Sequence, residues 1–365
     1  MRRPLLSVPT SRRGLFGLAG LALVATACGG DSDTPDERPT TPGSPLWVFA
    51  PHGVASAAPA VQVGDTVYVA RNGASVYAIS ARDGSSRWES PTGTSASRPA
   101  LVDDLLVTGL GGGDLVALDT AGGEERWRVP TSGMGVMAAP AVADGTAFVG
   151  GLDGVVRAVA VADGAELWTV TTGGQFFADP QLRDGAVHLG GSDGLLTAWE
   201  VADGAERWSF DTGEGMVSTA AFVGDLVCVG TAGGRVHAVD ARSGEPGWTS
   251  DVSGQVIDPV AAEGLVLAPC PSGRRLHALD GESGEERWQA TVSGELLPVA
   301  VRGDTVYYPA EPGLLVAAEL ATGTVRWEFE IGAAEAPGES VLNLAVSNDT
   351  LYLGTDQATA IALTT

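Results

Sequence analysis

The chain has 365 residues, of which 51 are glycine and 21 are proline, and its formal net charge is −24 at pH 7. All 21 basic residues are arginine, so mechanisms that need a lysine, such as Schiff-base chemistry, are excluded. The negative field disfavours nucleic acid and anionic lipid headgroups as partners, and the glycine and proline content indicates many turns rather than long helices.

Residues 1–27 are expected to be an export signal. A basic start is followed by an apolar run at 15–27, which is too short for a permanent membrane-spanning helix. Paired Arg12 and Arg13 before that run resemble a twin-arginine signal, and the sequence that ends in Cys28 resembles a lipoprotein box. We therefore expect Cys28 to carry lipid and to anchor the protein on the extracytoplasmic face of a membrane. Cleavage by an ordinary signal peptidase just before Cys28 is the alternative.

Residues 28–44 are polar and proline-rich, and they predict a disordered tether before a folded domain at 45–365. Cys228 and Cys270 fall in similar strands of that domain. Because an exported protein meets oxidising conditions, a disulfide and two buried free thiols both remain open from the sequence. A two-cysteine metal site is disfavoured, since no histidine lies nearby at metal-ligand spacing.

A repeat of about 40 residues runs through the folded domain. Its tryptophans are separated by 41, 39, 41, 40, 40, 40 and 39 residues, and they are Trp47, Trp88, Trp127, Trp168, Trp208, Trp248, Trp288 and Trp327. Seven of them have a glycine four residues earlier and an alanine ten residues earlier. We expect the glycine to take a left-handed conformation in a turn and the tryptophan to fill the space between neighbouring sheets.

Each repeat predicts four antiparallel strands. In residues 140–173 short apolar runs are broken by turns every 8–12 residues, which is typical of hairpins, and no run is long enough for a pair of helices. Residues 360–365 end the chain where the third strand of an eighth repeat should lie, so residues 45–50 are expected to supply its fourth strand. We therefore predict an all-β, eight-bladed β-propeller closed by its N-terminal strand.

Residues 117–127, ALDTAGGEERW, resemble the tryptophan-docking motif of the quinoprotein, or pyrroloquinoline quinone (PQQ)-like, repeat superfamily, as do 238–248 and 278–288. The resemblance covers about 47–365 and implies an eight-bladed propeller. One branch of the superfamily holds PQQ and Ca²⁺ and oxidises alcohols or sugars, typically with a vicinal disulfide and long loops between blades. This chain has no adjacent cysteines, and its short repeats leave little room for such loops.

The other branch is not catalytic. It includes the propeller lipoprotein of the outer-membrane barrel-assembly machinery and the sensor domains of some bacterial kinases. The resemblance therefore implies a monomeric scaffold or ligand sensor of the cell envelope, without cofactor or metal, that binds a protein or ligand through its funnel face. A PQQ-dependent oxidoreductase is the alternative, and an acidic Ca²⁺-binding structural propeller is a third reading.

Polar residues just before the inner strands predict the wall of a central channel, which is either a ligand site or merely filled with water: Arg98, Asp179, Asp258 and Asn343. Methionine and phenylalanine in the loops of the same face predict either a partner-binding rim or packing between blades: Met134, Met137, Phe176, Phe177 and Met216. The connection at 331–343 is longer than its equivalents and is counted with this rim.

The four histidines are expected to have no chemical role. His188, His237 and His277 fall at strand positions, where variation between repeats explains them, and His52 falls in a loop. No catalytic residue and no metal ligand is predicted.

Overall fold

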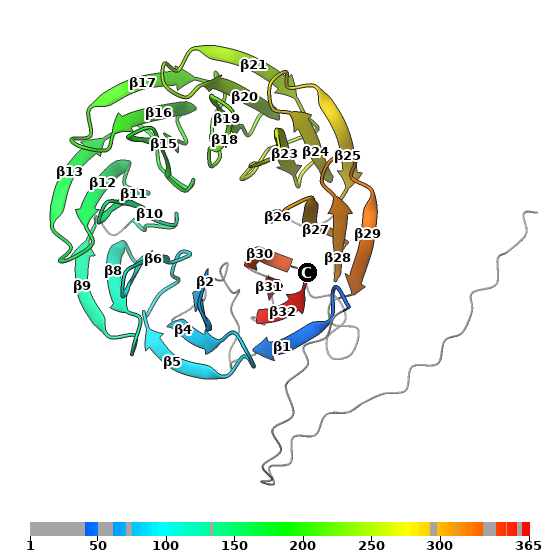
Figure 1. The fold of residues 1–365 in the computed structure, drawn as a ribbon. Helices are drawn as coiled ribbons and strands as arrows, with labels where there is room; N and C mark the ends of the chain where they lie inside the picture. The colour runs from blue at the N-terminus through cyan, green and yellow to red at the C-terminus, as the bar shows by residue number, and fades with distance from the viewer. Residues whose placement is uncertain are drawn as a thin grey trace, which may run out of the picture. The chain divides into compact units, whose positions relative to one another are not determined.

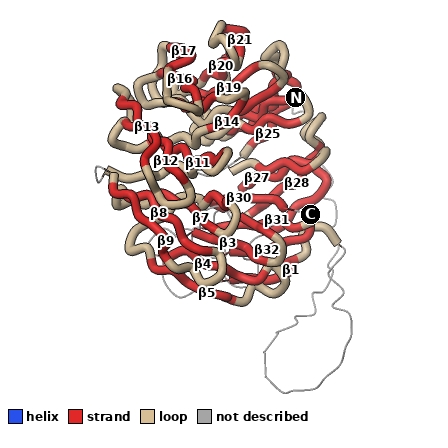
Figure 2. Tube along the Cα trace, turned by 60° about the vertical axis from the view of Figure 1, so that its left-hand side comes forward, coloured by secondary structure: helices blue, strands red, loops and turns tan. Residues whose placement is uncertain are grey.

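The computed structural model describes residues 41–49, 61–70, 75–131, 134–292, 298–311, 313–330, 341–347, 349–355 and 360–365. In these residues the regular elements are strands joined by turns and loops (Figure 2). The strands form eight four-stranded sheets arranged as blades in a ring (Figure 1). No helix in this part of the chain could cross a membrane. The expected export signal, Cys28 and His52 lie outside the described residues, as does residue range 331–340 of the long connection.

The strands follow one another along the whole described chain with short turns between them. Their bounds are β1 (Pro45–Phe49), β2 (Val61–Val63), β3 (Thr66–Ala70), β4 (Ser75–Ser80), β5 (Ser86–Pro91), β6 (Ala100–Val102), β7 (Leu105–Gly109), β8 (Asp114–Asp119), β9 (Glu125–Pro130), β10 (Ala141–Ala143), β11 (Thr146–Gly150), β12 (Val155–Ala160), β13 (Glu166–Thr171), β14 (Gln181–Arg183), β15 (Ala186–Gly190), β16 (Leu195–Glu200), β17 (Glu206–Asp211), β18 (Ala221–Val223), β19 (Leu226–Gly230), β20 (Arg235–Asp240), β21 (Pro246–Asp251), β22 (Val260–Ala262), β23 (Leu265–Cys270), β24 (Arg275–Asp280), β25 (Glu286–Thr291), β26 (Ala300–Arg302), β27 (Thr305–Glu311), β28 (Leu314–Glu319), β29 (Val325–Glu330), β30 (Val341–Ser347), β31 (Thr350–Thr355) and β32 (Ala360–Thr364).

The first blade is β2 to β5, and each later blade takes the next four strands, up to β26–β29 in the seventh. The eighth blade has the order β1-β32-β31-β30, so its outer strand comes from the N-terminal side of the chain (Figure 1). β1 pairs antiparallel with β32, with Val48 opposite Ile361. The expected eight-bladed propeller, closed by its N-terminal strand, is thereby confirmed. This pairing covers the edge that β32 would otherwise expose.

In the eighth blade, the turn that contains the repeated glycine is formed by two chain segments that are far apart in the sequence. Gly43, four residues before Trp47, has φ +77 and donates its N–H to the carbonyl oxygen of Thr364 at 2.8 Å. A side chain at Gly43 would begin 3.3 Å from the ring of Trp327. Residues 41–44, which we expected in the tether, therefore belong to the propeller, and Gly43 is an eighth turn glycine that was not predicted from the sequence.

The tryptophans connect each blade to the next one. Trp168 at the outer edge of the third blade donates its Nε1–H to the carbonyl oxygen of Val201 in the fourth at 3.0 Å, and its ring lies against Gly204. Gly204 has φ +72, and a Cβ added there would lie 2.7 Å from the ring. The same indole-to-carbonyl bond recurs from Trp47, Trp88, Trp127, Trp208, Trp248 and Trp288.

The core lies between blades rather than at one central place. One apolar cluster joins Leu267 and Leu276 of the sixth blade to Val306 and Tyr308 of the seventh. The middle strands are buried on both faces because a blade covers each side, as in β4, where every residue is buried. Outer strands such as β13 alternate between exposed and half-buried residues. The inner strands are short, and they leave space at the centre of the ring.

Candidate functional site

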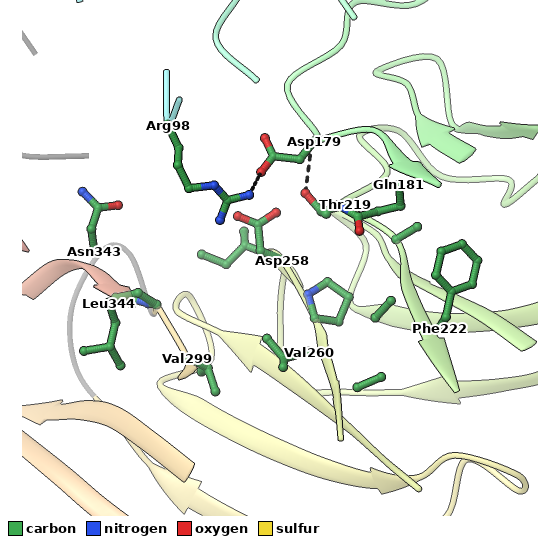
Figure 3. A pocket seen from close by; sticks show the side chains of 16 residues that line it. Arg98, Asp179, Gln181, Thr219, Phe222, Asp258, Val260, Val299, Asn343 and Leu344 are labelled. Carbon is green, nitrogen blue, oxygen red and sulfur yellow. Dashed lines mark hydrogen bonds and ion pairs between the residues drawn. The ribbon is translucent and has the colours of Figure 1, made fainter. Parts of the chain in front are cut away.

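A cavity of about 560 Å³ lies among the inner strands of the fourth to eighth blades (Figure 3). Its lining includes residues of β14, β18, β22 and β30, together with Pro298 and Val299 just before β26 and Arg98 from the second blade. The volume is in the range of small-molecule sites in proteins.

The structure brings all four channel candidates, Arg98, Asp179, Asp258 and Asn343, into the wall of this one cavity. The first three lie in the connections just before β6, β14 and β22, and Asn343 lies in β30. In Figure 3 these side chains gather at one end of the cavity, and Val260, Val299, Leu344 and Phe222 lie toward the other. The cavity can therefore offer polar contacts at one end and apolar contacts at the other. Whether a ligand occupies it stays a prediction.

Asp179 connects four consecutive blades. Its Oδ2 accepts a hydrogen bond from Nη2 of Arg98 at 2.8 Å, and its Oδ1 accepts the N–H of Ala139 at 2.6 Å. Its own N–H donates to Oγ1 of Thr219 at 3.1 Å. These partners belong to the connections that enter the second, third and fifth blades, while Asp179 enters the fourth. The contacts fix the polar end of the cavity.

The surroundings of Asp179 disfavour the charged form of its carboxyl group. Burial raises the pKa of Asp179 above its ordinary value, although Arg98 and the Ala139 N–H act in the opposite direction, and the nearby charge of Asp258 raises it further. The side chain keeps 26% of its surface accessible, so water in the cavity still reaches the carboxylate. The guanidinium of Arg98 is thus paired with Asp179. Asp258 adds a second carboxylate to the wall, and this one is exposed.

The lining does not suit PQQ with Ca²⁺. PQQ has three carboxylates and a planar ring system, whereas the lining has one cation, Arg98, which already faces Asp179, and one aromatic ring, Phe222. Two carboxylates in the same wall would repel an anionic cofactor. No group of three or more metal-binding side chains occurs in the part of the chain that the structure describes. The expectation of no cofactor stays a prediction.

The rim candidates divide into an exposed set and one buried residue. Met134, Met137, Phe177 and Met216 are 56, 46, 51 and 45% exposed. Phe176, which we expected on the rim, is instead 2% exposed, and its ring meets Trp199 edge-on with 6.3 Å between centroids. Successive residues of an extended connection point to opposite sides, so the burial of Phe176 turns Phe177 outward.

The exposed four lie on one face of the ring. They occupy the connections between β9 and β10, β13 and β14, and β17 and β18, which lead from the outer strand of one blade to the inner strand of the next. The same connections bring Asp179 and Thr219 to the cavity at their inner ends. We call Met134, Met137, Phe177 and Met216 the apolar rim.

Both cysteines of the propeller are free and buried. Loss of hydration raises the pKa of the Cys228 and Cys270 thiols to about 12. The thiols are therefore protonated near neutral pH and are poor nucleophiles and metal ligands.

The three histidines at repeated strand positions differ in their partners. His188 and His237 each have one ring nitrogen that is buried without a hydrogen bond, and burial lowers the pKa of both. His277 has polar partners on both nitrogens, Glu286 and Ser253. This group was not predicted from the sequence. Serine at the position of Ser253 is no distinguishing signal, because the corresponding loops of the second and sixth blades also have serine, Ser132 and Ser293.

Known proteins share the sequence family and the fold. The family model described as outer membrane protein assembly factor BamB matches residues 39–136, 113–255 and 232–365. This match confirms the expected PQQ-like repeat superfamily. No significant match was found among the curated proteins.

Solved structures with a similar fold include a designed protein, a BamB protein and an alcohol dehydrogenase. The designed protein Ika8 has a TM-score of 0.77 at 16% identity, with 88% of this chain and 100% of that chain covered. BamB from Moraxella catarrhalis has a TM-score of 0.72 at 19% identity, with 84% of this chain and 94% of that chain covered. The quinohemoprotein alcohol dehydrogenase ADHIIG from Pseudomonas putida HK5 has a TM-score of 0.68 at 14% identity, with 88% of this chain and 76% of that chain covered. At such identities the likeness shows the fold alone.

Proposed function

The chain belongs to the family of the outer membrane protein assembly factor BamB, and we propose that it is a lipid-anchored scaffold that binds a partner protein through the apolar rim. The proposed site is the cell envelope, on the extracytoplasmic face of a membrane. The partner presents an apolar segment to the rim.

The observation that carries this proposal is the exposure of four large apolar side chains on successive loops of one face. Single exposed apolar side chains are common on protein surfaces, but several gathered on neighbouring loops of one face mark interaction surfaces. Three of the four are methionine, whose flexible thioether adapts to different partner shapes. The propeller supplies rigid support, because each loop is held by a blade on either side.

The strong negative charge narrows the kind of partner. With a net charge of −24 the chain attracts surfaces that carry basic residues and repels acidic ones. We therefore expect an apolar contact segment flanked by arginine or lysine in the partner.

Site-specific photo-crosslinking in cells that make the full chain tests the interaction. Crosslinkers replace Met137 and Phe177 on the rim and, as controls, Leu167 and Val325, which are 55% and 49% exposed on the outer strands β13 and β29. We expect one protein to be captured from the rim positions and not from the controls. Equal capture from all four positions, or none from the rim, would overturn the proposal.

The lipid anchor at Cys28 is tested separately. We expect the full chain to incorporate a clickable fatty acid and to fractionate with membranes, and Cys28→Ser to lose both properties. A Cys28→Ser protein that still carries the label would contradict the anchor.

The alternative, a PQQ-dependent oxidoreductase, predicts a different result. Protein mixed with PQQ and Ca²⁺ is passed through a gel-filtration column, and its visible spectrum and melting curve are recorded. We expect no retained quinone absorbance and no change in melting temperature. Retained quinone with a raised melting temperature would favour the oxidoreductase over a scaffold without catalysis.

A further inference from the structure

Three side chains at the junction of the fifth and sixth blades form a hydrogen-bonded chain. Oγ of Ser253, in the loop after β21, lies 2.8 Å from Nε2 of His277 in β24. Nδ1 of His277 lies 2.6 Å from Oε2 of Glu286, the first residue of β25. Figure 1 shows the fifth blade, which ends in β21, next to the sixth blade, which contains β24 and β25. Ser253 lies in the connection between these two blades.

The contacts determine which nitrogen of His277 carries the proton. The backbone N–H of Ser253 also points at Nε2, at 3.4 Å. An N–H group can only donate, so Nε2 is the acceptor and carries no hydrogen, and its one lone pair faces both the N–H and the hydroxyl of Ser253. Nδ1 then carries the hydrogen and donates it to the carboxylate of Glu286. The hydroxyl of Ser253 donates to Nε2, which is the orientation that a general base needs to take its proton.

The group combines an accessible serine with a buried base. Ser253 is exposed, whereas the His277 side chain is 7% exposed. Burial holds the imidazole in place, and Glu286, at 41% exposure, orients it. The loop that holds Ser253 continues to Asp258 in the cavity wall, so the serine lies on the same face as the apolar rim.

Glycine at two neighbouring positions lets backbone approach the serine closely. A Cβ at Gly273 would lie 2.5 Å from Oγ of Ser253, and a Cβ at Gly254 would lie 2.5 Å from Oγ of Ser272. Side chains at either position would obstruct the contact between these two loops. The crowding is relieved only because both residues are glycine, and Oγ thereby keeps its place beside His277.

We propose that Ser253 is an activated nucleophile that accepts an acyl group from a neutral or cationic ester, with His277 as general base and Glu286 as a positioning residue. A nucleophile within hydrogen-bond reach of a base, itself oriented by a third group, is the arrangement that acyl transfer requires. The substrate is neutral or cationic because the protein's negative field repels anions.

The reaction balances with water as the only other reactant. The Oγ–H proton of Ser253 moves to Nε2 of His277 as Oγ bonds to the ester carbonyl carbon. The ester C–O bond then breaks, and the proton on Nε2 passes to the leaving oxygen to release an alcohol. Water repeats the sequence on the acyl-serine: it gives a proton to Nε2, attacks the carbonyl carbon, and the Oγ–C bond breaks. Ser253 regains its proton and the acid is released.

Labelling of the purified mature protein with a fluorophosphonate probe, mapped by peptide mass spectrometry, tests the proposal. We expect covalent label on Ser253 in the folded protein and none in Ser253→Ala. His277→Gln should slow labelling by about 100-fold or more, the usual contribution of a general base. Ser272→Ala is the matched control, because Ser272 lies in the facing loop and bonds to the N–H of Gln255 rather than to histidine. It should label like the wild type.

A second pair of measurements keeps the result independent of folding. Mixing with 4-nitrophenyl acetate should give a burst of 4-nitrophenolate that Ser253→Ala, altered only at an exposed loop position, does not give. In proton NMR spectra the Nδ1–H of His277 should resonate at unusually low field and should lose that signal in Glu286→Gln. Absence of label on Ser253 in the folded wild type, or equal labelling rates in His277→Gln, would overturn the proposal and leave Ser253 as a hydrogen bond between blades.

Discussion

Arg98 and Asp179 form an ion pair across the intervening third blade, with 2.8 Å between Nη2 and Oδ2. They stand 81 residues apart in the sequence. The pair therefore connects the entries of the second and fourth blades at the polar end of the cavity, and its strength depends on the protonation of Asp179.

Substitution Asp179→Asn should stabilise the propeller relative to wild type more at neutral than at acidic pH. Burial raises the pKa of Asp179 above its ordinary 3.8, so the folded protein binds this proton more tightly than the unfolded chain. As pH rises above 3.8 toward the folded value, the wild type loses stability through this group and the asparagine variant does not. Urea unfolding at a series of pH values measures the difference.

Arg98→Ala supplies the control for this pH dependence. Without the guanidinium, the Asp179 carboxylate loses its favourable charge partner. The difference in unfolding free energy between Arg98→Ala and Arg98→Ala/Asp179→Asn should therefore increase with pH more steeply than the difference between wild type and Asp179→Asn. The effect at neutral pH should stay within about 1 kcal/mol, because Arg98 is 44% exposed. A gap that narrows as pH rises would contradict the raised pKa.

Gly204→Ala should destabilise the propeller more than Gly213→Ala. Both glycines have φ +72, so the left-handed conformation should cost an alanine about 1–2 kcal/mol of stability at either position. A Cβ at 204 lies 2.7 Å from the ring of Trp168, whereas nothing lies within 4 Å at 213. Overpacking of this kind adds about 1–3 kcal/mol. Thermal and urea unfolding of the two variants measure the difference.

The two variants separate the conformational role of the repeated glycine from its role as a platform for tryptophan. Equal destabilisation would mean that the indole moves away from the added methyl group without loss.

Cys228 and Cys270 should resist alkylation in the folded protein. Burial raises the pKa of both thiols to about 12, so few thiolates exist at pH 8 and the reagent cannot reach them. Treatment with iodoacetamide, followed by mass spectrometry, should find neither residue modified before unfolding and both modified in guanidinium chloride. A disulfide between the two would instead leave them unmodified in guanidinium chloride until a reductant is added.

The architecture could be predicted because it depends on features that recur at a fixed period. One tryptophan, one glycine and one alanine per repeat specify a contact between neighbouring blades, and a missing last strand implies closure. The exception was Gly43, which stands in the same place relative to Trp47 as the other turn glycines. It was overlooked because the turn that it completes includes Thr364, at the far end of the chain.

The site could be predicted only where the repeat register alone determines position. That register placed Arg98, Asp179 and Asp258, which precede inner strands, in one wall with Asn343, although Asn343 lies within β30 rather than before it. It could not distinguish Phe176 from its exposed neighbour, since their directions depend on the local course of an irregular loop. Nor could it show that Ser253 meets His277, because a loop of one blade and a strand of the next must be placed together.

Deletion of residues 39–49 should lower the melting temperature sharply, whereas a circular permutant should keep it. The deletion removes β1, exposes the edge of β32 and removes Trp47, whose burial contributes up to about 5 kcal/mol. The permutant joins Thr365 to Thr41 through a short glycine linker and opens the chain in the exposed turn at Asp144 and Gly145. Because every strand pair is retained, its melting curve should stay within a few degrees of wild type. A deletion that melts like the wild type would mean that the ring does not depend on β1. A lowered melting temperature of the permutant alone would mean that covalent continuity at the Asp144 turn matters more than closure.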